Sequence, residues 1–174
     1  MVAPIRTTTD MVAYIDGTEM AGHASSIEFE AIEYENSEED RLGIIGTPEV
    51  FMKIPVVLVN VTWRSLLPEW ALLASNPILA FPLQFRGNIT AQDASGVTDF
   101  LPTIIEVTGI SKSTPSGGSI EKSDGAEYET QWRCTRAVQT INGAPIFDYD
   151  LYAYKWAVGG DDLFAPQRGN LGIG

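Results

Sequence analysis

The stretch that decides the fold is residues 128–157, YETQWRCTRAVQTINGAPIFDYDLYAYKWA. Asn142-Gly143, near its centre, is the dipeptide most typical of a two-residue β-hairpin turn. A long strand is expected before this turn, over residues 128–141, and its partner strand is expected over residues 147–157. A β-hairpin of this length predicts a fold dominated by strands.

Other parts of the chain carry similar signals. Residues 11–15 alternate in polarity and lead into Asp16-Gly17, a second hairpin turn. Further strands are expected over residues 26–35, 55–63, 81–89 and 101–110.

One helix is expected in the middle of the chain. Ser65 can cap it, Pro68 suits its first turn, and Pro77 ends it. The remaining segments, 36–53, 91–100 and 112–126, have the composition of loops. At 174 residues, with no internal repeat or linker, the chain is expected to form a single domain.

The charge of the chain is unbalanced. Asp and Glu total 23 and Lys and Arg total 11, so the formal net charge is −12. Ten of the acidic residues, and no basic ones, lie between Asp10 and Asp40. Because DNA-binding surfaces neutralise phosphates with Lys and Arg, specific DNA binding is not expected.

The sequence gives few signs of secretion or membrane insertion. Cys134 is the only cysteine, so no intrachain disulfide can form, as suits folding in a reducing compartment. Residues 1–10 lack the apolar run of a secretion signal, and the longest nearly apolar run, 54–61, is too short to span a bilayer. A soluble protein made in the cytoplasm is expected.

The residues offer no convincing catalytic, cofactor-binding or metal-binding constellation. His23 is the only histidine, and Cys134 falls within an expected strand, where a buried structural role is the usual one. The paired acids of the strands are expected to be solvated, and Asp161-Asp162 lacks the spacing of a calcium loop. No enzymatic activity and no cofactor are therefore predicted.

The acidic segment 26–35, SIEFEAIEYE, is the most informative part of the chain. Glu28 and Glu30 alternate with apolar residues, and so do Glu33 and Glu35, but the two halves differ in phase by one residue. A β-bulge at Ala31-Ile32 would bring all four carboxylates onto one face. That face is either the solvent-exposed side of an ordinary sheet or the negatively charged wall of a water-filled space.

Three segments resemble the major tail tube proteins of contractile-tailed phages and contractile bacteriocins. They are TDMVAYIDGTEMAG over residues 9–22, TINGAPIFDYD over residues 140–150, and AVGGDDLFAPQRGNLGI over residues 157–173. They are similar, in order, to the family's opening strand and turn, its later hairpin, and its closing segment. The chain departs from the family where Glu30-Ala31-Ile32 stands in place of a Leu-Pro pair.

The resemblance implies an all-β fold with one short helix, a β-sandwich or barrel whose strands join neighbours into a ring-wide inner β-barrel. Six-membered rings would stack into a tube. Residues 1–9 and 163–174 would be arms contacting other subunits, and residues 36–53 would form a loop reaching the next ring. The candidate contacts in this loop are Glu38, Glu39, Asp40, Arg41, Ile44 and Ile45.

The resemblance also implies partners and a location. A sheath would surround the tube, a tape-measure protein and DNA would pass through it, and baseplate and tail-terminator proteins would hold its ends. The subunit would assemble in the host bacterial cytoplasm and reside in the virion tail. The glutamates expected to face the lumen are Glu28, Glu30, Glu33 and Glu35.

Two other interpretations remain open. The chain resembles, in architecture, the hexameric ring proteins of type VI secretion and the tube initiators of baseplates. It is also compatible with a monomeric β-sandwich binding module, which would not assemble.

Overall fold

Two tight turns set the register of the main sheet. Asp16 and Gly17 have φ values of 48° and 79°, and Asn142 and Gly143 have φ values of 50° and 76°. Positive φ at both central residues is the hallmark of the type I′ turn, whose twist matches that of the flanking strands. Both predicted hairpin turns are therefore confirmed.

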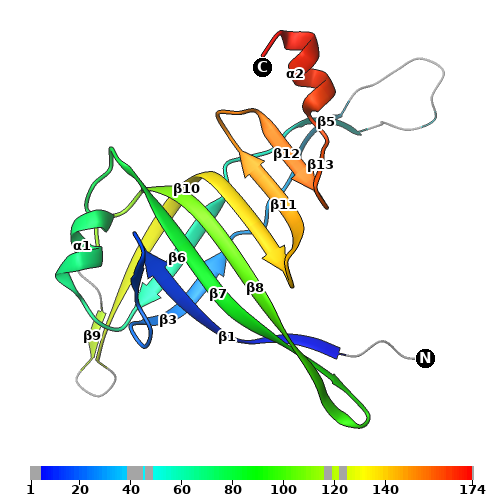
Figure 1. Cartoon of the computed structure of the whole chain (residues 1–174). Coiled ribbons are helices and arrows are strands. Elements are labelled where there is room, and N and C mark those ends of the chain that lie inside the picture. The colour runs from blue at the N-terminus through cyan, green and yellow to red at the C-terminus, as the bar shows by residue number, and fades with distance from the viewer. Residues whose placement is uncertain (1–4, 39–44, 46–48, 116–118, 122–124, 174) are drawn as a thin grey trace.

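The computed structural model describes residues 5–38, 45, 49–115, 119–121 and 125–173. The fold is mostly antiparallel β, as predicted, with two short helices in place of the one expected (Figure 1). Its elements are β1 (Ile5–Ile15), β2 (Thr18–Glu19), β3 (Ala24–Phe29), β4 (Glu35–Glu38), β5 (Glu49–Lys53), β6 (Leu58–Trp63), α1 (Pro68–Ala74), β7 (Ala80–Asp93), β8 (Gly96–Ser111), β9 (Ser119–Glu121), β10 (Gly125–Ile141), β11 (Ala144–Asp150), β12 (Lys155–Val158), β13 (Asp161–Asp162) and α2 (Ala165–Leu171).

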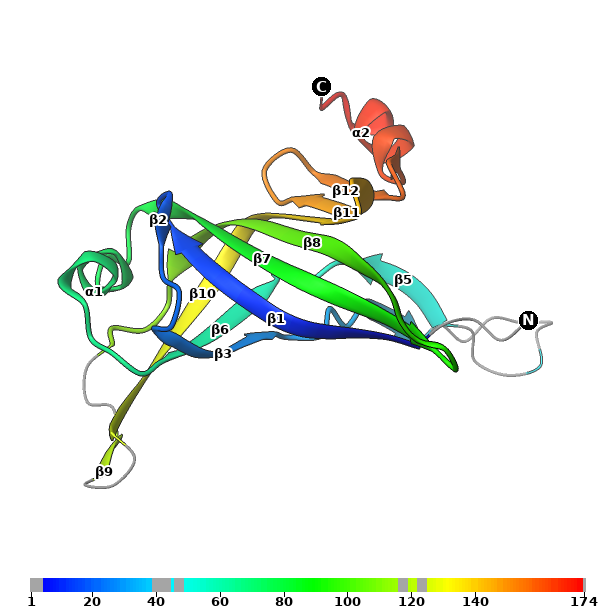
Figure 2. The same ribbon diagram turned by 60° about the horizontal axis from the view of Figure 1, so that its bottom comes forward.

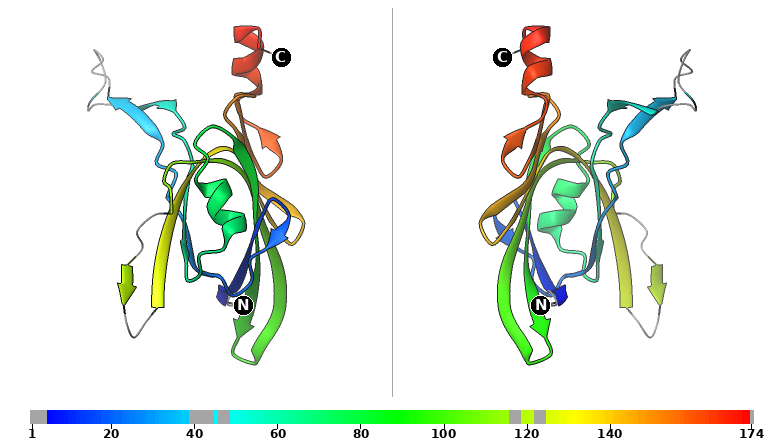
Figure 3. Two further views of the ribbon diagram at one scale, coloured as in Figure 1. Left: turned by 90° about the vertical axis from the view of Figure 1, so that its left-hand side faces the viewer. Right: turned by 90° about the vertical axis from the view of Figure 1, so that its right-hand side faces the viewer.

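Six strands form a strongly curved sheet in the order β3-β6-β10-β8-β7-β1. The long strand β10 connects its two halves, because residues 128–133 pair with β6 and residues 132–141 pair with β8. The sheet curls into an open half-barrel, and α1 lies between its two walls at one end (Figures 2 and 3).

Three tryptophans form the centre of the core. Trp63, Trp70 and Trp132 are fully buried, and the rings of Trp63 and Trp70 stack with centroids 4.7 Å apart. The indole nitrogens of Trp63 and Trp132 both donate to Oγ1 of Thr130, over 2.9 and 3.1 Å. Burial of an indole is costly unless its N–H is paired, so Thr130 allows two large side chains to pack side by side.

The predicted central helix is confirmed, but its start differs from the expectation. Leu67 is the N-cap residue and makes no side-chain capping bond, while Pro68 opens the helix. Ser65 instead places its Oγ 2.5 Å from Nδ1 of His23. Trp70 points into the core and its indole donates to the Ser65 carbonyl oxygen over 3.1 Å, which fixes the helix on the sheet.

Gly87 lies where β7 approaches β1 too closely for a side chain to fit. A Cβ atom at this position would lie 2.9 Å from the Asp10 carbonyl oxygen and 3.0 Å from Cγ2 of Thr103. The β1–β7 register shifts between Thr8 and Asp10, directly beside this point. The bulge and the glycine together let the two strands follow the curvature of the sheet.

The C-terminal part forms a small lobe of β11, β12, β13 and α2. The strand predicted over residues 147–157 is wrong as a single element, since a turn at residues 151–154 divides it into β11 and β12. The C-terminal arm expected over residues 163–174 contains α2. Arg168 holds this helix by an ion pair with Asp162 (2.7 Å) and a hydrogen bond to the Tyr154 carbonyl oxygen (3.1 Å).

Three other expectations are corrected. The strand expected over residues 26–35 ends at Phe29, and Glu35 begins a different strand, so no bulge joins the two halves. The loop expected over residues 91–100 is the end of a hairpin, with β7 running to Asp93 and β8 starting at Gly96. Residues 5–9, expected to belong to an N-terminal arm, are part of β1 and pair with β7.

Candidate functional site

The outward face of β3, β6 and β10 carries two rows of polar side chains. In one row Glu28 lies opposite Asn60, which lies opposite Gln131. In the next row Ser26 lies opposite Thr62, which lies opposite Glu129. Alternation sends the intervening valines of β6 into the core, so these side chains must point outward. We call this surface the acidic face.

Glu30 anchors one border of the acidic face. Its Oε1 accepts hydrogen bonds from the side-chain amides of Asn60 (3.0 Å) and Gln131 (3.1 Å). Its backbone N–H donates to the Leu58 carbonyl oxygen over 3.1 Å. Glu30 therefore holds the chain on the sheet at the point where the chain leaves β3. Its carboxylate is hydrogen-bonded, whereas the Glu28 side chain is exposed.

The other two predicted glutamates lie away from these rows. Glu33 is exposed in the irregular segment between β3 and β4. Glu35 begins β4 and forms an ion pair with Lys53 of β5 over 3.2 Å. The structure thus brings Glu28 and Glu30 together on the acidic face and places Glu33 and Glu35 along the path to the next hairpin.

That hairpin, β4–β5, occupies the segment predicted to be an extended loop over residues 36–53. Its strands pair from Glu35↔Lys53 to Glu38↔Glu49. Of the predicted contact residues, Glu38 and Ile45 are exposed, while Glu39, Asp40, Arg41 and Ile44 lie outside the described residues. We call β4–β5 the arm hairpin.

Aromatic side chains fix the base of the arm hairpin to the C-terminal lobe. The Phe51 ring lies 6.2 Å from Tyr34 and 5.9 Å from Phe164 of the lobe, measured between centroids. Tyr34 in turn meets Trp156 edge-on at 6.3 Å. Aromatic pairs at such separations contribute about 0.5–1.5 kcal/mol each beyond burial. The direction of the hairpin is thus set by contacts with the lobe.

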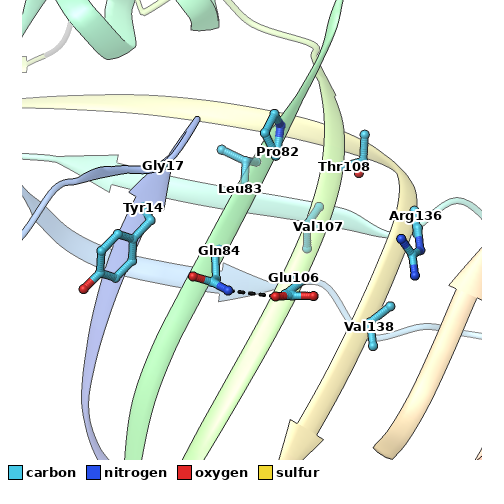
Figure 4. Close-up of a pocket in the computed structure, with 10 residues that line it drawn as sticks. All are labelled: Tyr14, Gly17, Pro82, Leu83, Gln84, Glu106, Val107, Thr108, Arg136 and Val138. Atoms are coloured by element: carbon cyan, nitrogen blue, oxygen red, sulfur yellow. Dashed lines mark hydrogen bonds between the residues drawn. The ribbon is translucent and has the colours of Figure 1, made fainter.

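A second polar network crosses the outward face of β8, β7 and β1 (Figure 4). Gln84 donates to Glu106 over 2.8 Å and accepts from Nε of Arg86 over 2.8 Å. The Arg86 guanidinium lies 5.2 Å from the centroid of the Tyr14 ring. With Arg136 nearby on β10, this part of the outward face is mixed in charge and lines a shallow depression.

Both borders of the curved sheet are open in the described part of the chain. β3 pairs with β6 on one side only. β1 pairs with β7 on one side, and on the other its last residues alone meet β2, with Met20 donating to the Ala13 carbonyl oxygen. Residues 5–12 and the outer side of β3 therefore present backbone groups to which another strand could bind.

The single cysteine of the chain lies in the core. Cys134 is fully buried, and burial raises the pKa of its thiol to about 12. The described residues include no group of three or more His, Cys, Asp or Glu side chains that could hold a metal ion. In this same part of the chain, no helix has the length and apolar character needed to cross a membrane.

Sequence reasoning missed part of the acidic face. Asn60, Thr62, Gln131 and Glu129 complete its rows but lie far from the acidic segment in sequence. Residues 59–63 alternate between apolar and polar types, a pattern that predicts a shared face for Asn60 and Thr62. Their register with β3 is fixed by tertiary pairing, which no local pattern reveals.

Comparisons with known proteins agree with this architecture. A family model described as phage tail tube protein FII matches residues 5–172. A chain from the cryo-EM structure of an extracellular contractile injection system, the PVC sheath-tube complex in its extended state, has a TM-score of 0.53 at 14% identity, covering 75% of this chain and 87% of that one. A chain from the PVC sheath/tube terminator in the extended state also has a TM-score of 0.53, at 13% identity, with coverages of 75% and 92%. No curated protein matches significantly. At these identities the solved structures share the fold.

Proposed function

The chain belongs to the phage tail tube protein FII family, and from this membership we propose that six copies join edge to edge into a ring and that the rings stack into a tail tube. The role of the family is structural, a tube subunit of a tail.

The observation that carries the proposal is the pair of open borders on the curved sheet. β1 and β3 lie at its two extremes. In the part of the chain that the structure describes, β3 has one side without a strand partner, and on the outer side of β1 only Tyr14 and Ile15 pair, with β2. Exposed edges bind other strands unless they are blocked. When β3 of one copy joins β1 of the next, the contact is heterologous, and repeated rotation closes it into a ring.

The acidic face is proposed to line the channel. It lies on β3, β6 and β10, so joining the β3 edge to β1 of the next copy would place it beside the outward face of β1 in that copy. Glu28, Glu30 and Glu129 would then repel the phosphates of passing DNA, and at physiological salt the repulsion extends about 8 Å from the wall. Glu33 and Glu35, beyond the border of the face, would add charge toward one opening.

The arm hairpin and the outer surface are proposed to meet the other components. The arm hairpin would reach the adjacent ring, as expected for residues 36–53, and the terminal segments would add contacts between subunits. A contractile sheath would surround the tube, a proposal supported by the likeness to chains of sheath-tube assemblies. Tape-measure protein and DNA would occupy the lumen, with baseplate and terminator proteins at the ends of a tail assembled in bacterial cytoplasm.

Light scattering combined with electron microscopy tests this function. The purified chain has a mass of 19.0 kDa, and we expect a species of six times that mass as concentration rises, followed by tubes of constant diameter in negative stain. A chain that stays at the monomer mass at every concentration, with or without a sheath protein, would contradict the proposal and favour the binding module.

A further inference from the structure

Both ends of the half-barrel expose apolar side chains, but the surface protrudes at one end and is hollow at the other. At the α1 end the apolar groups protrude. Leu72 on the outer side of α1 is 72% exposed, and Ile78 and Leu79, in the segment joining α1 to β7, are 81% and 56% exposed. Glu69 lies one helical turn before Leu72 and is also exposed. Apolar groups gathered in this way on a folded chain mark a contact surface.

At the opposite end the apolar groups line a hollow. This is the end where β1 begins and where the β7–β8 hairpin turns (Figure 2). The shallow hollow is lined by Ala91, Leu101, Ile141 and Ile146, with Arg6, Thr98 and Asp99 among its polar walls. Around it Ile5 and Val97 are 74% and 54% exposed. Among the described residues, no helix covers this end as α1 covers the other (Figure 3).

The two surfaces have features that would allow them to meet. One presents protruding leucine and isoleucine side chains, and the other a depression with apolar walls. Glu69 accompanies the protruding surface and Arg6 the hollow. The Asp99 carboxylate in the hollow accepts a hydrogen bond from the backbone amide of Phe100 over 2.8 Å, so it is engaged locally. Opposite charges across a contact select the partner and its orientation.

The position of the arm hairpin also favours a second copy of this chain as the partner that fills the hollow. Its strand β5 lies at the end of the molecule that carries the hollow, away from α1 (Figures 1 and 2). A copy whose α1 end sat against the hollow would therefore also lie within the region into which the arm hairpin extends. A contact between unlike ends of one molecule is heterologous and repeats without limit along a line.

We propose that the hollow between β7–β8 and the β10–β11 turn binds the α1 end of a second copy of this chain, so that rings stack head to tail. Leu72, Ile78 and Leu79 insert toward Ala91, Leu101 and Ile146, and Glu69 faces Arg6. This inference rests on the proposed tube function and gives the contact between successive rings a location and a polarity.

Charge reversal tests the contact between Glu69 and Arg6. Tube formation by Glu69→Lys, by Arg6→Glu and by the double variant is measured as the critical concentration for sedimentation. Each single variant is expected to raise it several-fold and the double variant to restore it. Leu72→Glu is expected to raise it at least about tenfold, which corresponds to about 1.4 kcal/mol, while rings still form. Equal critical concentrations for all variants would overturn the inference.

Cross-linking tests the polarity of the contact. Native Cys134 is buried, so new surface cysteines react alone. When Leu72→Cys and Ile146→Cys proteins carrying different tags are mixed under tube-forming conditions and treated with a short bismaleimide, mixed dimers are expected. Leu72→Cys alone should give none, and neither should a mixture with Tyr152→Cys, an exposed position on the C-terminal lobe. Tubes that form normally without the mixed cross-link would refute the head-to-tail contact and leave the tube function standing, whereas a wild-type chain that never forms tubes would refute the function itself.

Discussion

Trp70 stacks on Trp63 with their ring planes 17° apart, and this pair attaches α1 to the sheet. We expect Trp70→Ala to lower the free energy of unfolding by about 3–5 kcal/mol, because it leaves a cavity in a fully buried site and removes the packing of the helix. Urea unfolding followed by far-UV circular dichroism measures the change. Leu72→Ala, on the exposed side of the same helix, should cost less than about 0.5 kcal/mol.

Glu30 is expected to contribute to stability more than Glu28, although both lie on the acidic face. Glu30→Ala removes a carboxylate that accepts from Asn60 and Gln131, and hydrogen bonds to a charged acceptor are worth about 1.5–3 kcal/mol together with the cost of unpaired partners. Since Glu30 is only partly buried, solvent screening weakens these contacts, and we expect a loss of about 1 kcal/mol in thermal or urea unfolding. Equal losses for Glu30→Ala and Glu28→Ala would show that the two amide contacts contribute nothing.

The charge of the acidic face is expected to control DNA retention in assembled tubes. The double variant Glu28→Lys/Glu129→Lys should still assemble but should bind short duplex DNA at low salt, with affinity falling as salt rises. Fluorescence anisotropy measures the binding. Glu19→Lys/Asp161→Lys makes the same change in net charge elsewhere on the surface and is the matched control. Equal DNA binding by the two variants would argue against a channel lined by this face.

Phe51 is expected to hold the arm hairpin in its direction. Phe51→Ala removes the ring between Tyr34 and Phe164, so the base of β4–β5 should open more often and its amides should exchange faster. Hydrogen exchange by mass spectrometry over residues 35–38 and 49–53 tests this. Tyr152→Ala removes an exposed aromatic from the same lobe and should leave the exchange unchanged. If both variants exchange alike, the aromatic contacts do not restrain the hairpin.

Cys134 gives the unfolding free energy a specific dependence on alkaline pH. Burial raises the pKa of its thiol from the ordinary 9.0 to about 12. Above pH 9 the unfolded thiol loses its proton while the folded one keeps it, so stability falls as pH rises through this window. The slope approaches about 1.4 kcal/mol per pH unit. Cys134→Ala should show a shallower decline over the same range, and an unchanged slope would mean that the thiol ionises in the folded state.

Local signals in the sequence located the turns and the long strands well. Asn142-Gly143 and Asp16-Gly17 require positive φ, and few other dipeptides adopt it easily, so the hairpins at these positions were predictable. The central helix was predictable from Pro68 and Trp70 for similar reasons. Its cap was not, because the Ser65 hydroxyl is engaged by His23, a residue 42 positions away.

The other differences have long-range causes. The alternation of acidic and apolar residues shifts by one position at Ala31-Ile32 because the chain leaves the sheet there. A β-bulge would produce the same sequence pattern, so the two cases cannot be told apart from the sequence. The β7–β8 hairpin extends past the core, so its polar residues resemble those of a loop. The helix α2 contains Pro166 and Gly169, both poor helix formers. It is held by the ion pair of Arg168 with Asp162 and ends at Gly172 in the left-handed conformation.

The absence of a side chain at Gly87 affects the dimensions of the proposed ring. Any side chain there must push Asp10, and with it β1, away from β7, because the obstructing atom belongs to the backbone. In the proposed ring β1 is also the strand that meets the neighbour, so the same displacement would recur at every junction. Added over all the junctions, these displacements would change the diameter of the channel. A single methyl group at position 87 would thus alter the width of the whole tube.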